Sequence, residues 1–304
     1  MAVTLAQAAA NETDPVKKGA LQTAIGVSNV WDRLPFESIT GNAYAYDKDR
    51  VLPGTAFRTV NEAYVESTGV VNQDTERLQI LGGDADVDQF IEKTFSASTG
   101  VLMADQVKMK LESAQATFVD AMFNGDVDVR DAKEFDGLRK RLIGDQVIDA
   151  SATLADEAFL DDLDLLFGQV QGGAPDVCYT NQTVLSRLKS LGRKVGGADY
   201  INSEITGKRE FTWNGVAFID PGEHWSGRVI LPYDTTEGTD VYAIKFARSW
   251  SDVGVMGITN GGLQAKFLGE LQEKPAVRTR IDFYTGLVVQ GGKAAARLRG
   301  VKKN

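Results

Sequence analysis

The chain has 304 residues, of which 43% are hydrophobic and 25% are charged, proportions typical of a folded globular protein. Its 42 acidic side chains outnumber 33 Lys and Arg, and the net charge of −9 argues against a protein that coats DNA, because such proteins need a basic excess to replace phosphate counterions. The single cysteine excludes an internal disulfide, and the apolar runs are too short for a transmembrane helix.

Residues 1–35 predict a mostly helical, weakly hydrophobic arm. Asp14 followed by Pro15 is typical of a helix start, since an aspartate caps free N–H groups and proline fits the first turn. The segment has too few large apolar side chains to form a core of its own. We therefore expect it to pack on another part of the chain or on another chain.

Residues 36–72 predict a long β-hairpin. Tyr44 and Tyr46 alternate with small residues, the polar stretch DKDRVLPG (47–54) is expected to be the turn, and the second run continues to Tyr64. A two-stranded hairpin with few large aliphatic residues is marginal alone in water. We expect it to be stabilised by a partner.

The clearest helix is predicted from Thr99 to Phe123, a length of about 37 Å at ~1.5 Å per residue. Large or small apolar residues recur there at steps of three and four, which makes one apolar stripe. These residues are Val107, Leu111, Ala114, Phe118 and Met122. Core packing is the expected role of this stripe, so the segment is interpreted as a scaffold helix.

Three adjacent cations follow the predicted glycine turn Phe135–Leu138 in the stretch EFDGLRKRLIGDQVID, which begins at Glu134. Arg139, Lys140 and Arg141 could bind a phosphate, contact the acidic face of a neighbouring subunit, or lie in solvent. The sequence alone leaves these three possibilities open.

From about residue 151 the pattern alternates between helix and strand. Helical periodicity covers 154–170, a buried strand contains Cys178, and Asn181 is placed to cap the next helix. Asn214-Gly215 predicts a tight hairpin. Further strands are expected at 228–234, at 240–247 and on both sides of Gly291-Gly292, and we expect the closing segment to return to the earlier lobe.

No catalytic set is evident. The only histidine, His224, has no G-x-S-x-G nucleophile elbow to serve and is interpreted as a loop residue beside Trp225. Cys178 has the surroundings of a buried structural thiol. The glycine-rich stretches lack the spacing of phosphate-binding loops. We expect no enzyme activity and no cofactor.

Calcium-loop patterns also fail. In DADVDQF (84–90) the sixth position of the loop is Gln89 and the twelfth is Phe95, where glycine and glutamate are needed. DVDVRD (126–131) has Gly137 at the twelfth position. Both aspartate clusters are interpreted as solvated turn carboxylates, and no metal site is expected.

In this order the segments resemble a tailed-bacteriophage major capsid protein of the HK97-like fold. The resemblance depends on LQILGGDADVDQFI before the long helix, EFDGLRKRLIGDQVID after it, and then PDVCYTNQTVLSRLKSL, FTWNGVAFIDPG and KPAVRTRIDFYTGLVVQGGKAAARLRG. Each phrase is weak alone, and their order carries the likeness over essentially the whole chain.

The resemblance implies an α+β fold with named parts. These are an N-terminal arm (1–35), an E-loop hairpin (36–72), a P-domain with a spine helix (73–150, helix about 99–123), an α/β A-domain (151–284) and return strands of the P-domain (285–304). It also implies a major capsid protein that self-assembles through pentamers and hexamers into an icosahedral phage head enclosing double-stranded DNA, located in the virion and assembled in the host bacterial cytoplasm.

The implied partners are other copies of the chain, a portal, packaged DNA contacted non-specifically, and possible decoration proteins, with no membrane. Because the chain starts at Met1 with the arm, scaffolding is expected from a separate protein. The candidate subunit contacts are Lys48, Asp49, Arg50, Arg139, Lys140 and Arg141. Some relatives crosslink an E-loop lysine to a neighbour's asparagine, and Lys48 is the candidate in this hairpin, although a solvated lysine is the simpler interpretation.

Three alternatives are kept. An encapsulin, a nanocompartment shell protein of the same fold, would hold enzymes instead of a genome. A small α/β hydrolase would have to use His224. A nucleic-acid-binding module conflicts with the net charge of −9.

Overall fold

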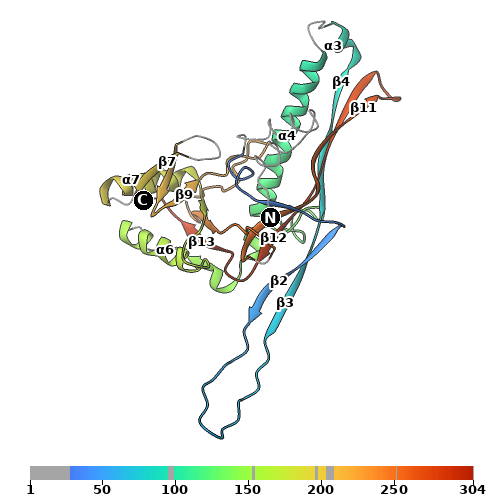
Figure 1. The fold of residues 1–304 in the computed structure, drawn as a ribbon. Helices are drawn as coiled ribbons and strands as arrows, with labels where there is room; N and C mark the ends of the chain where they lie inside the picture. The colour runs from blue at the N-terminus through green and yellow to red at the C-terminus, as the bar shows by residue number, and fades with distance from the viewer. Residues whose placement is uncertain are drawn as a thin grey trace.

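The computed structural model describes residues 28–94, 99–152, 155–195, 198–202, 209–250 and 252–303. A long helix lies between a lobe of strands and helices on one side and long strands on the other, and a thin hairpin extends away from both (Figure 1). In these described residues the strands form sheets of four, seven and two strands. Most of the predicted N-terminal arm, residues 1–27, lies outside the described ranges.

The long helix α4 (Thr99–Asn124) confirms the prediction of a scaffold helix. Leu111, Phe118 and Met122 of the predicted stripe are fully buried in the main core. The helix ends at Asn124, and Gly125 packs against the turn that follows, where a Cβ on Gly125 would lie 2.3 Å from the Phe135 carbonyl oxygen. This close approach is available only to glycine.

The four-stranded sheet runs alongside α4 in the order β1-β11-β12-β4. The strands are β1 (Phe36–Ser38), β11 (Gly254–Glu270), β12 (Ala276–Gln290) and β4 (Gln79–Asp88). β11, β12 and β4 pair antiparallel, whereas β1 joins β11 in parallel. Beyond β4, α3 (Gln89–Thr94) leads towards α4.

Aromatic side chains fill the space between α4 and this sheet. The Phe118 ring lies 4.9 Å from that of Trp31 and 5.6 Å from that of Phe36, measured between centroids, and Phe283 of β12 contacts the same group. Trp31 is fully buried, so the chain just before β1 is part of the core. Residues 28–35, predicted as the end of the arm, therefore pack on another part of the chain and belong to the main core.

The seven-stranded sheet forms the lobe, in the order β5-β13-β10-β6-β9-β8-β7. Its strands are β5 (Val147–Asp149), β13 (Ala295–Val301), β10 (Thr239–Ile244), β6 (Val177–Tyr179), β9 (Val216–Ile219), β8 (Arg209–Trp213) and β7 (Ala198–Asn202). Helices α6 (Asp156–Gly168) and α7 (Gln182–Val195) pack with it around a second core.

Three local predictions in this lobe are confirmed. The side chain of Asn181 accepts a hydrogen bond of 2.8 Å from the Thr183 N–H at the start of α7. Asn214 and Gly215 both have positive φ, 48° and 81°, as a two-residue hairpin turn requires. Cys178 is fully buried in β6, and burial raises the pKa of its thiol.

One expectation about the sheets holds in part and one is wrong. The closing segment, with 285–304 predicted as return strands, is expected to rejoin the earlier lobe. β12 does so by pairing with β4 beside α4, whereas β13 pairs with β10 and β5 in the seven-stranded sheet. Residues 228–234 form no strand. The Asn124 and Asn181 side chains instead hydrogen-bond the carbonyls of Ile230 and Leu231.

Candidate assembly interface

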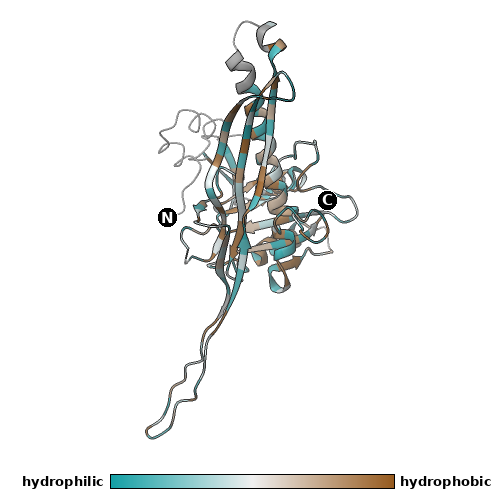
Figure 2. Cartoon of the chain, turned by 90° about the vertical axis from the view of Figure 1, so that its right-hand side faces the viewer, coloured by the Kyte–Doolittle hydropathy of each residue, from teal (hydrophilic) through white to brown (hydrophobic). Residues whose placement is uncertain are grey.

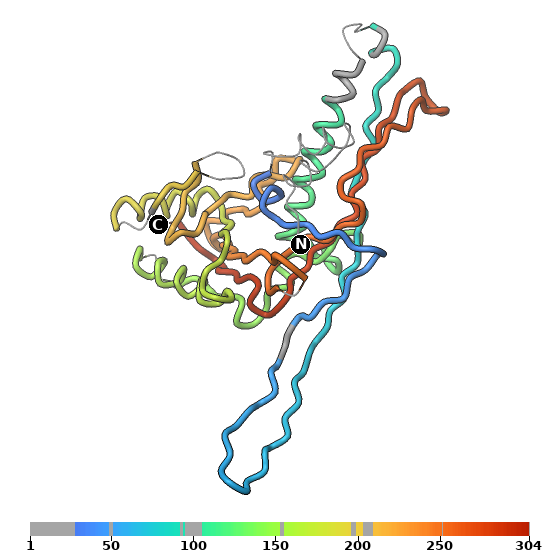
Figure 3. The backbone as a smooth tube through the Cα atoms, viewed as in Figure 1, coloured from blue at the N-terminus to red at the C-terminus, as the bar shows by residue number. Residues whose placement is uncertain are grey.

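The hairpin is a two-stranded ribbon that projects far from the body (Figures 1 and 3). It consists of β2 (Ala43–Val51) paired antiparallel with β3 (Val70–Arg77). The expected turn at 47–54 is wrong, because β2 runs through most of this stretch and the chain reverses near 59–62. The polar residues of 47–54 fit an exposed strand as well as a turn, so their polarity does not locate the reversal of the chain.

Beyond its root the hairpin contacts no other described part of the chain (Figure 2), and its apolar side chains are exposed. Phe57 is completely exposed and Val60 is 89% exposed. The other large apolar residues exposed here are Val51, Leu52, Tyr64, Val65, Val70 and Val71. Apolar surface presented on a projecting ribbon marks a contact site for another molecule.

The tip has its own internal hydrogen bonds. Glu62 accepts bonds of 2.9 Å from both the N–H and the hydroxyl of Thr59, and Asn61 takes the positive φ of 67° that the reversal needs. The guanidinium of Arg58 lies 5.1 Å from the centre of the Tyr64 ring. The exposed tip is therefore organised without a partner, which lowers the entropy cost of binding one.

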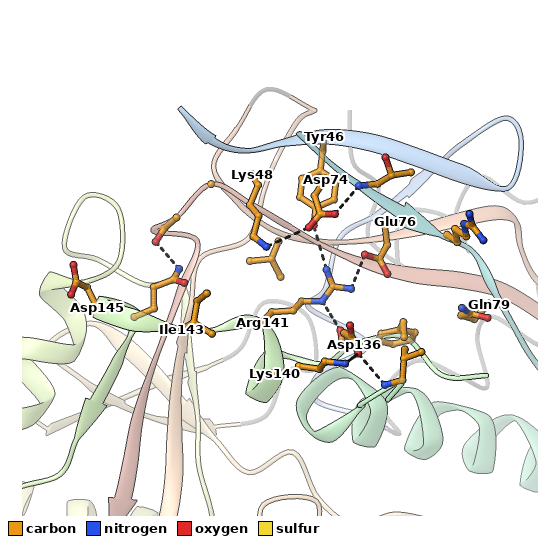
Figure 4. Close-up of a pocket in the computed structure, with 18 residues that line it drawn as sticks. Tyr46, Lys48, Asp74, Glu76, Gln79, Asp136, Lys140, Arg141, Ile143 and Asp145 are labelled. Carbon is orange, nitrogen blue, oxygen red and sulfur yellow. Dashed lines mark hydrogen bonds and ion pairs between the residues drawn. The ribbon is translucent and has the colours of Figure 1, made fainter. Parts of the chain in front are cut away.

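The root of the hairpin packs against the body. The rings of Tyr44 and Trp250 lie 4.3 Å apart, and Tyr46 is buried in a small core with Met256 and Val288. A cleft of about 620 Å³ opens between the root and the segment after α4 (Figure 4). Sequence reasoning selected Tyr44 and Tyr46 only as strand residues and missed this contact.

Of the three predicted cations, Lys140 and Arg141 lie on the wall of this cleft. The turn before them packs against the end of α4, where a Cβ on Gly137 would lie 2.5 Å from the Ala121 carbonyl oxygen. α5 (Leu138–Arg141) follows directly. This placement separates the three cations: Arg139 is exposed, whereas Lys140 and Arg141 turn towards carboxylates of the same chain (Figure 4).

Lys140 lies among three aspartates. Its Nζ is 2.6 Å from Asp128, 2.9 Å from Asp126 and 2.9 Å from Asp136. The hydrogen bonds that Lys140 donates to these carboxylates raise its pKa. Asp126 and Asp128 are thus partners of Lys140 rather than merely solvated turn residues.

Arg141 crosses to the hairpin. Its Nη2 lies 2.7 Å from Glu76 of β3, and its Nη1 donates a bond of 3.3 Å to the Tyr46 hydroxyl. Both ionic side chains are mostly buried, with 12% of Arg141 and 14% of Glu76 exposed. The phosphate-binding hypothesis for this cation is unsupported, because its guanidinium is already bonded within the chain.

The other predicted contact residues lie farther along the ribbon. Lys48 is about half exposed and forms a weak ion pair of 3.4 Å with Asp74 across the strands. Asp49 and Arg50 belong to β2, and their side chains lie outside the described set. A role in subunit contacts stays a prediction for all six candidates, Lys48, Asp49, Arg50, Arg139, Lys140 and Arg141.

A second exposed surface, which sequence reasoning missed, lies at the far end of the four-stranded sheet. Phe90 is 74% exposed and Phe267 is 66% exposed. Nearby, Asp86 and Asp84 of β4 pair with Arg278 and Arg280 of β12 across the ladder. The expectation of solvated turn carboxylates at 84–88 is therefore wrong, since these aspartates are strand residues with fixed partners.

The remaining chemical candidates give no catalytic site. His224 Nδ1 lies 2.9 Å from the Ser226 hydroxyl on an exposed loop, and its ring is beside Trp225, as expected. Within the described ranges no cluster of three His, Cys, Asp or Glu side chains could hold a metal ion. Among the helices described there, none is long and apolar enough to cross a membrane.

Comparison with solved structures finds the same arrangement of elements elsewhere. The holo-SrpI encapsulin complex from Synechococcus elongatus PCC 7942 matches with a TM-score of 0.67 at 18% identity, over 98% of this chain and 94% of that chain. Microbacterium phage Oxtober96 matches with a TM-score of 0.62 at 15% identity, over 91% of both chains. The chain has the HK97 fold.

The capsid of an empty GTA particle gives a TM-score of 0.62 at 14% identity, over 90% of both chains. No protein-family model matches the sequence, and no curated protein matches it. The HK97 fold confirms the α+β class and the resemblance found in the sequence.

Proposed function

We propose that this chain is the subunit of a closed protein shell, and that the shell is the head of a tailed phage enclosing double-stranded DNA. Copies would join through rings of five and six, in which the same pair of surfaces meets head to tail around each ring. The observation that carries the proposal is the projecting hairpin. Its residues 51–71 expose a row of apolar side chains that no other described part of the chain covers and that another copy of the chain would bury.

Many moderate contacts suit such a shell better than one strong contact. A shell subunit uses several separate surfaces, and their combined effect exceeds that of each contact alone. The hairpin tip and the end of the four-stranded sheet near Phe90 and Phe267 are two such surfaces, and they lie at opposite ends of the folded molecule (Figure 1). The net charge of −9 suits a container whose lining does not bind DNA tightly.

The proposed partners follow from this function. They are other copies of the chain, a separate scaffolding protein, a portal, and decoration proteins on the outer surface. The shell would assemble in the host cytoplasm and remain in the virion. If Lys48 forms a covalent link to a neighbour, boiled shells will give ladders of multimers in denaturing gels, and replacement by arginine will remove them.

An encapsulin-type nanocompartment is the second candidate. It is favoured by the match to the Synechococcus encapsulin, which extends over 98% of this chain. The two candidates differ in what the shell encloses. Nuclease-protected DNA in purified particles supports the phage head, whereas a packaged protein without DNA supports the compartment.

Electron microscopy of the purified protein tests the shell itself, first expressed alone and then with its neighbouring genes. A double variant Phe57→Ser/Val60→Ser is expected to abolish closed particles while leaving the circular dichroism spectrum unchanged, because both side chains are exposed in the subunit. Val129→Ser is the matched control, since Val129 is 85% exposed away from the hairpin. Wild-type particles from the double variant would contradict the role of the tip.

A further inference from the structure

The hairpin root contains a mostly buried ion pair that is centred on one arginine. Arg141 reaches from α5 to β3 and β2, where it meets Glu76 at 2.7 Å and the Tyr46 hydroxyl at 3.3 Å. Its Nε also donates to the backbone carbonyl of Asp136 at 2.5 Å. We name Arg141, Glu76, Tyr46 and Asp136 the root cluster (Figure 4).

The cluster contains more carboxylates than guanidinium groups. Burial raises the pKa of Glu76, opposed by Arg141, while Asp74 and Asp136 add to the rise. Burial alone would lower the pKa of Arg141, yet its neighbours, Glu76 first, raise it. The two pKa shifts agree: the neighbouring carboxylates favour the charged guanidinium of Arg141, and the additional carboxylates disfavour the ionised form of Glu76.

Removing either partner of such a pair therefore has unequal effects. Loss of Arg141 leaves Glu76 buried without its cation, a situation that strongly destabilises proteins. Loss of the Glu76 charge removes a carboxylate whose burial is already unfavourable. A neutral glutamine in its place can still accept a hydrogen bond from Arg141.

The ribbon beyond the cluster lacks comparable support. The pairing of β2 and β3 shifts register between Asp47 and Asp49, so that Lys48 is the extra residue of a β-bulge, which bends and twists a ribbon. Past this bulge the side chains from Val51 to Val71 are all exposed. Within the described residues, the contacts that can fix the direction of the projection therefore lie on the body side of Lys48.

On that side Arg141 is the polar link between the hairpin and the segment after α4. Lys140 anchors this segment in turn through Asp126, Asp128 and Asp136. The apolar contacts of Tyr44 and Tyr46 cover the other side of the root. One ion pair therefore completes a two-sided attachment.

We infer that Arg141 is the positioning residue of the hairpin: it locks the root onto the body and so sets the direction in which the tip meets its partner. The lock is a property of the subunit itself. Its consequence for assembly rests on the proposed shell function, because a tip that points in varying directions cannot meet the same surface in every copy.

Hydrogen exchange of backbone amides, followed by mass spectrometry on the full-length subunit before assembly, tests the lock. Arg141→Gln is expected to raise exchange in 43–47 and 73–77 at least tenfold, with β6 (Val177–Tyr179) unchanged. Arg139→Gln is the matched control, since Arg139 is exposed two positions away, and it should exchange as wild type does. Glu76→Gln should change exchange less than threefold.

Arg141→Lys covers the case in which Arg141→Gln does not fold. It keeps the charge but lacks the fork that reaches Glu76, Tyr46 and the Asp136 carbonyl together, so we expect a rise of about threefold. Wild-type exchange in the folded Arg141 variant, or an equal rise in Arg139→Gln, would overturn the inference. An equal rise in Glu76→Gln would overturn the charge argument behind it.

Particle formation by the same variants separates the two proposals. If wild type forms no shells while Arg141→Gln loosens the root, the proposed function fails and the lock is supported. If wild type forms shells and the loosened variant forms equally uniform ones, the lock is supported in the subunit and its role in assembly is refuted.

Discussion

Replacing Phe118 by alanine tests how the body of the chain is held together. The side chain is fully buried in α4, and its ring lies 4.9 Å from Trp31, 5.5 Å from Phe135 and 5.6 Å from Phe36. The first and last of these partners belong to one stretch, residues 31–36, and the other lies in the turn after α4. A third segment, β12, contributes Phe283, whose ring lies 6.2 Å away, so Phe118 is the common contact of three segments separated in sequence.

The expected loss follows from burial and cavity formation. Truncation of a buried phenylalanine to alanine costs about 3–5 kcal/mol, and aromatic pairs contribute ~0.5–1.5 kcal/mol beyond their buried area. Because several such pairs are lost together, we expect a loss of about 4–5 kcal/mol. Phe118→Leu keeps most of the volume and should cost about 1.5 kcal/mol.

Equilibrium urea unfolding of the subunit measures this loss, with tryptophan fluorescence as the probe because Trp31 contacts the mutated site. Val129→Ala is the control and should stay within about 0.5 kcal/mol of wild type. A change below about 1 kcal/mol for Phe118→Ala, at an unchanged denaturant slope, would show that the aromatic cluster does not hold these three segments together.

Three further predictions concern single sites. The hydrogen bond from Arg278 holds the pKa of Asp86 far below its usual range. The ionised Asp86 carboxylate therefore stabilises the fold above the ordinary pKa of about 4, and this effect is lost as pH falls through the lower folded value. Asp86→Asn should flatten the fall of Tm on acidification below about pH 4, and an unchanged slope would contradict the pairing. Gly215 has φ of 81°, so Gly215→Ala should cost about 1 kcal/mol, whereas Gly168→Ala at the end of α6 should not destabilise; equal Tm values for both would refute the turn argument. Cys178 is fully buried and should resist iodoacetamide at about pH 8, near the ordinary pKa of a free thiol, until the chain is unfolded with urea, whereas rapid native labelling would contradict its burial.

Elements with strong local patterns were predictable from the sequence. The three- and four-residue spacing of Leu111, Phe118 and Met122 predicts α4 because it makes one continuous apolar face. Asn214-Gly215 predicts its turn because few other residues accept positive φ at both positions. The order of such elements in the sequence already resembles that of the HK97 fold.

Only the tertiary structure decides which charged residues are buried and which partners they pair with. Arg139, Lys140 and Arg141 are equivalent in sequence, yet the fold leaves the first exposed and buries the third against Glu76. The local pattern around Asp86 predicts a turn carboxylate, because its partner Arg278 lies 192 residues away. An ion pair requires a particular distance in space, and sequence spacing contains no such information across long separations.

The hairpin shows the same division. The composition of residues 36–72 predicts an exposed ribbon that needs a partner, since alternation of small, polar and aromatic residues is a local property. Where the ribbon reverses, how it is bent at Lys48, and which side chains attach it to the body depend on the pairing of β2 with β3 and on contacts with α5. Periodicity alone therefore determined that a projection exists, and only long-range packing determined where it points.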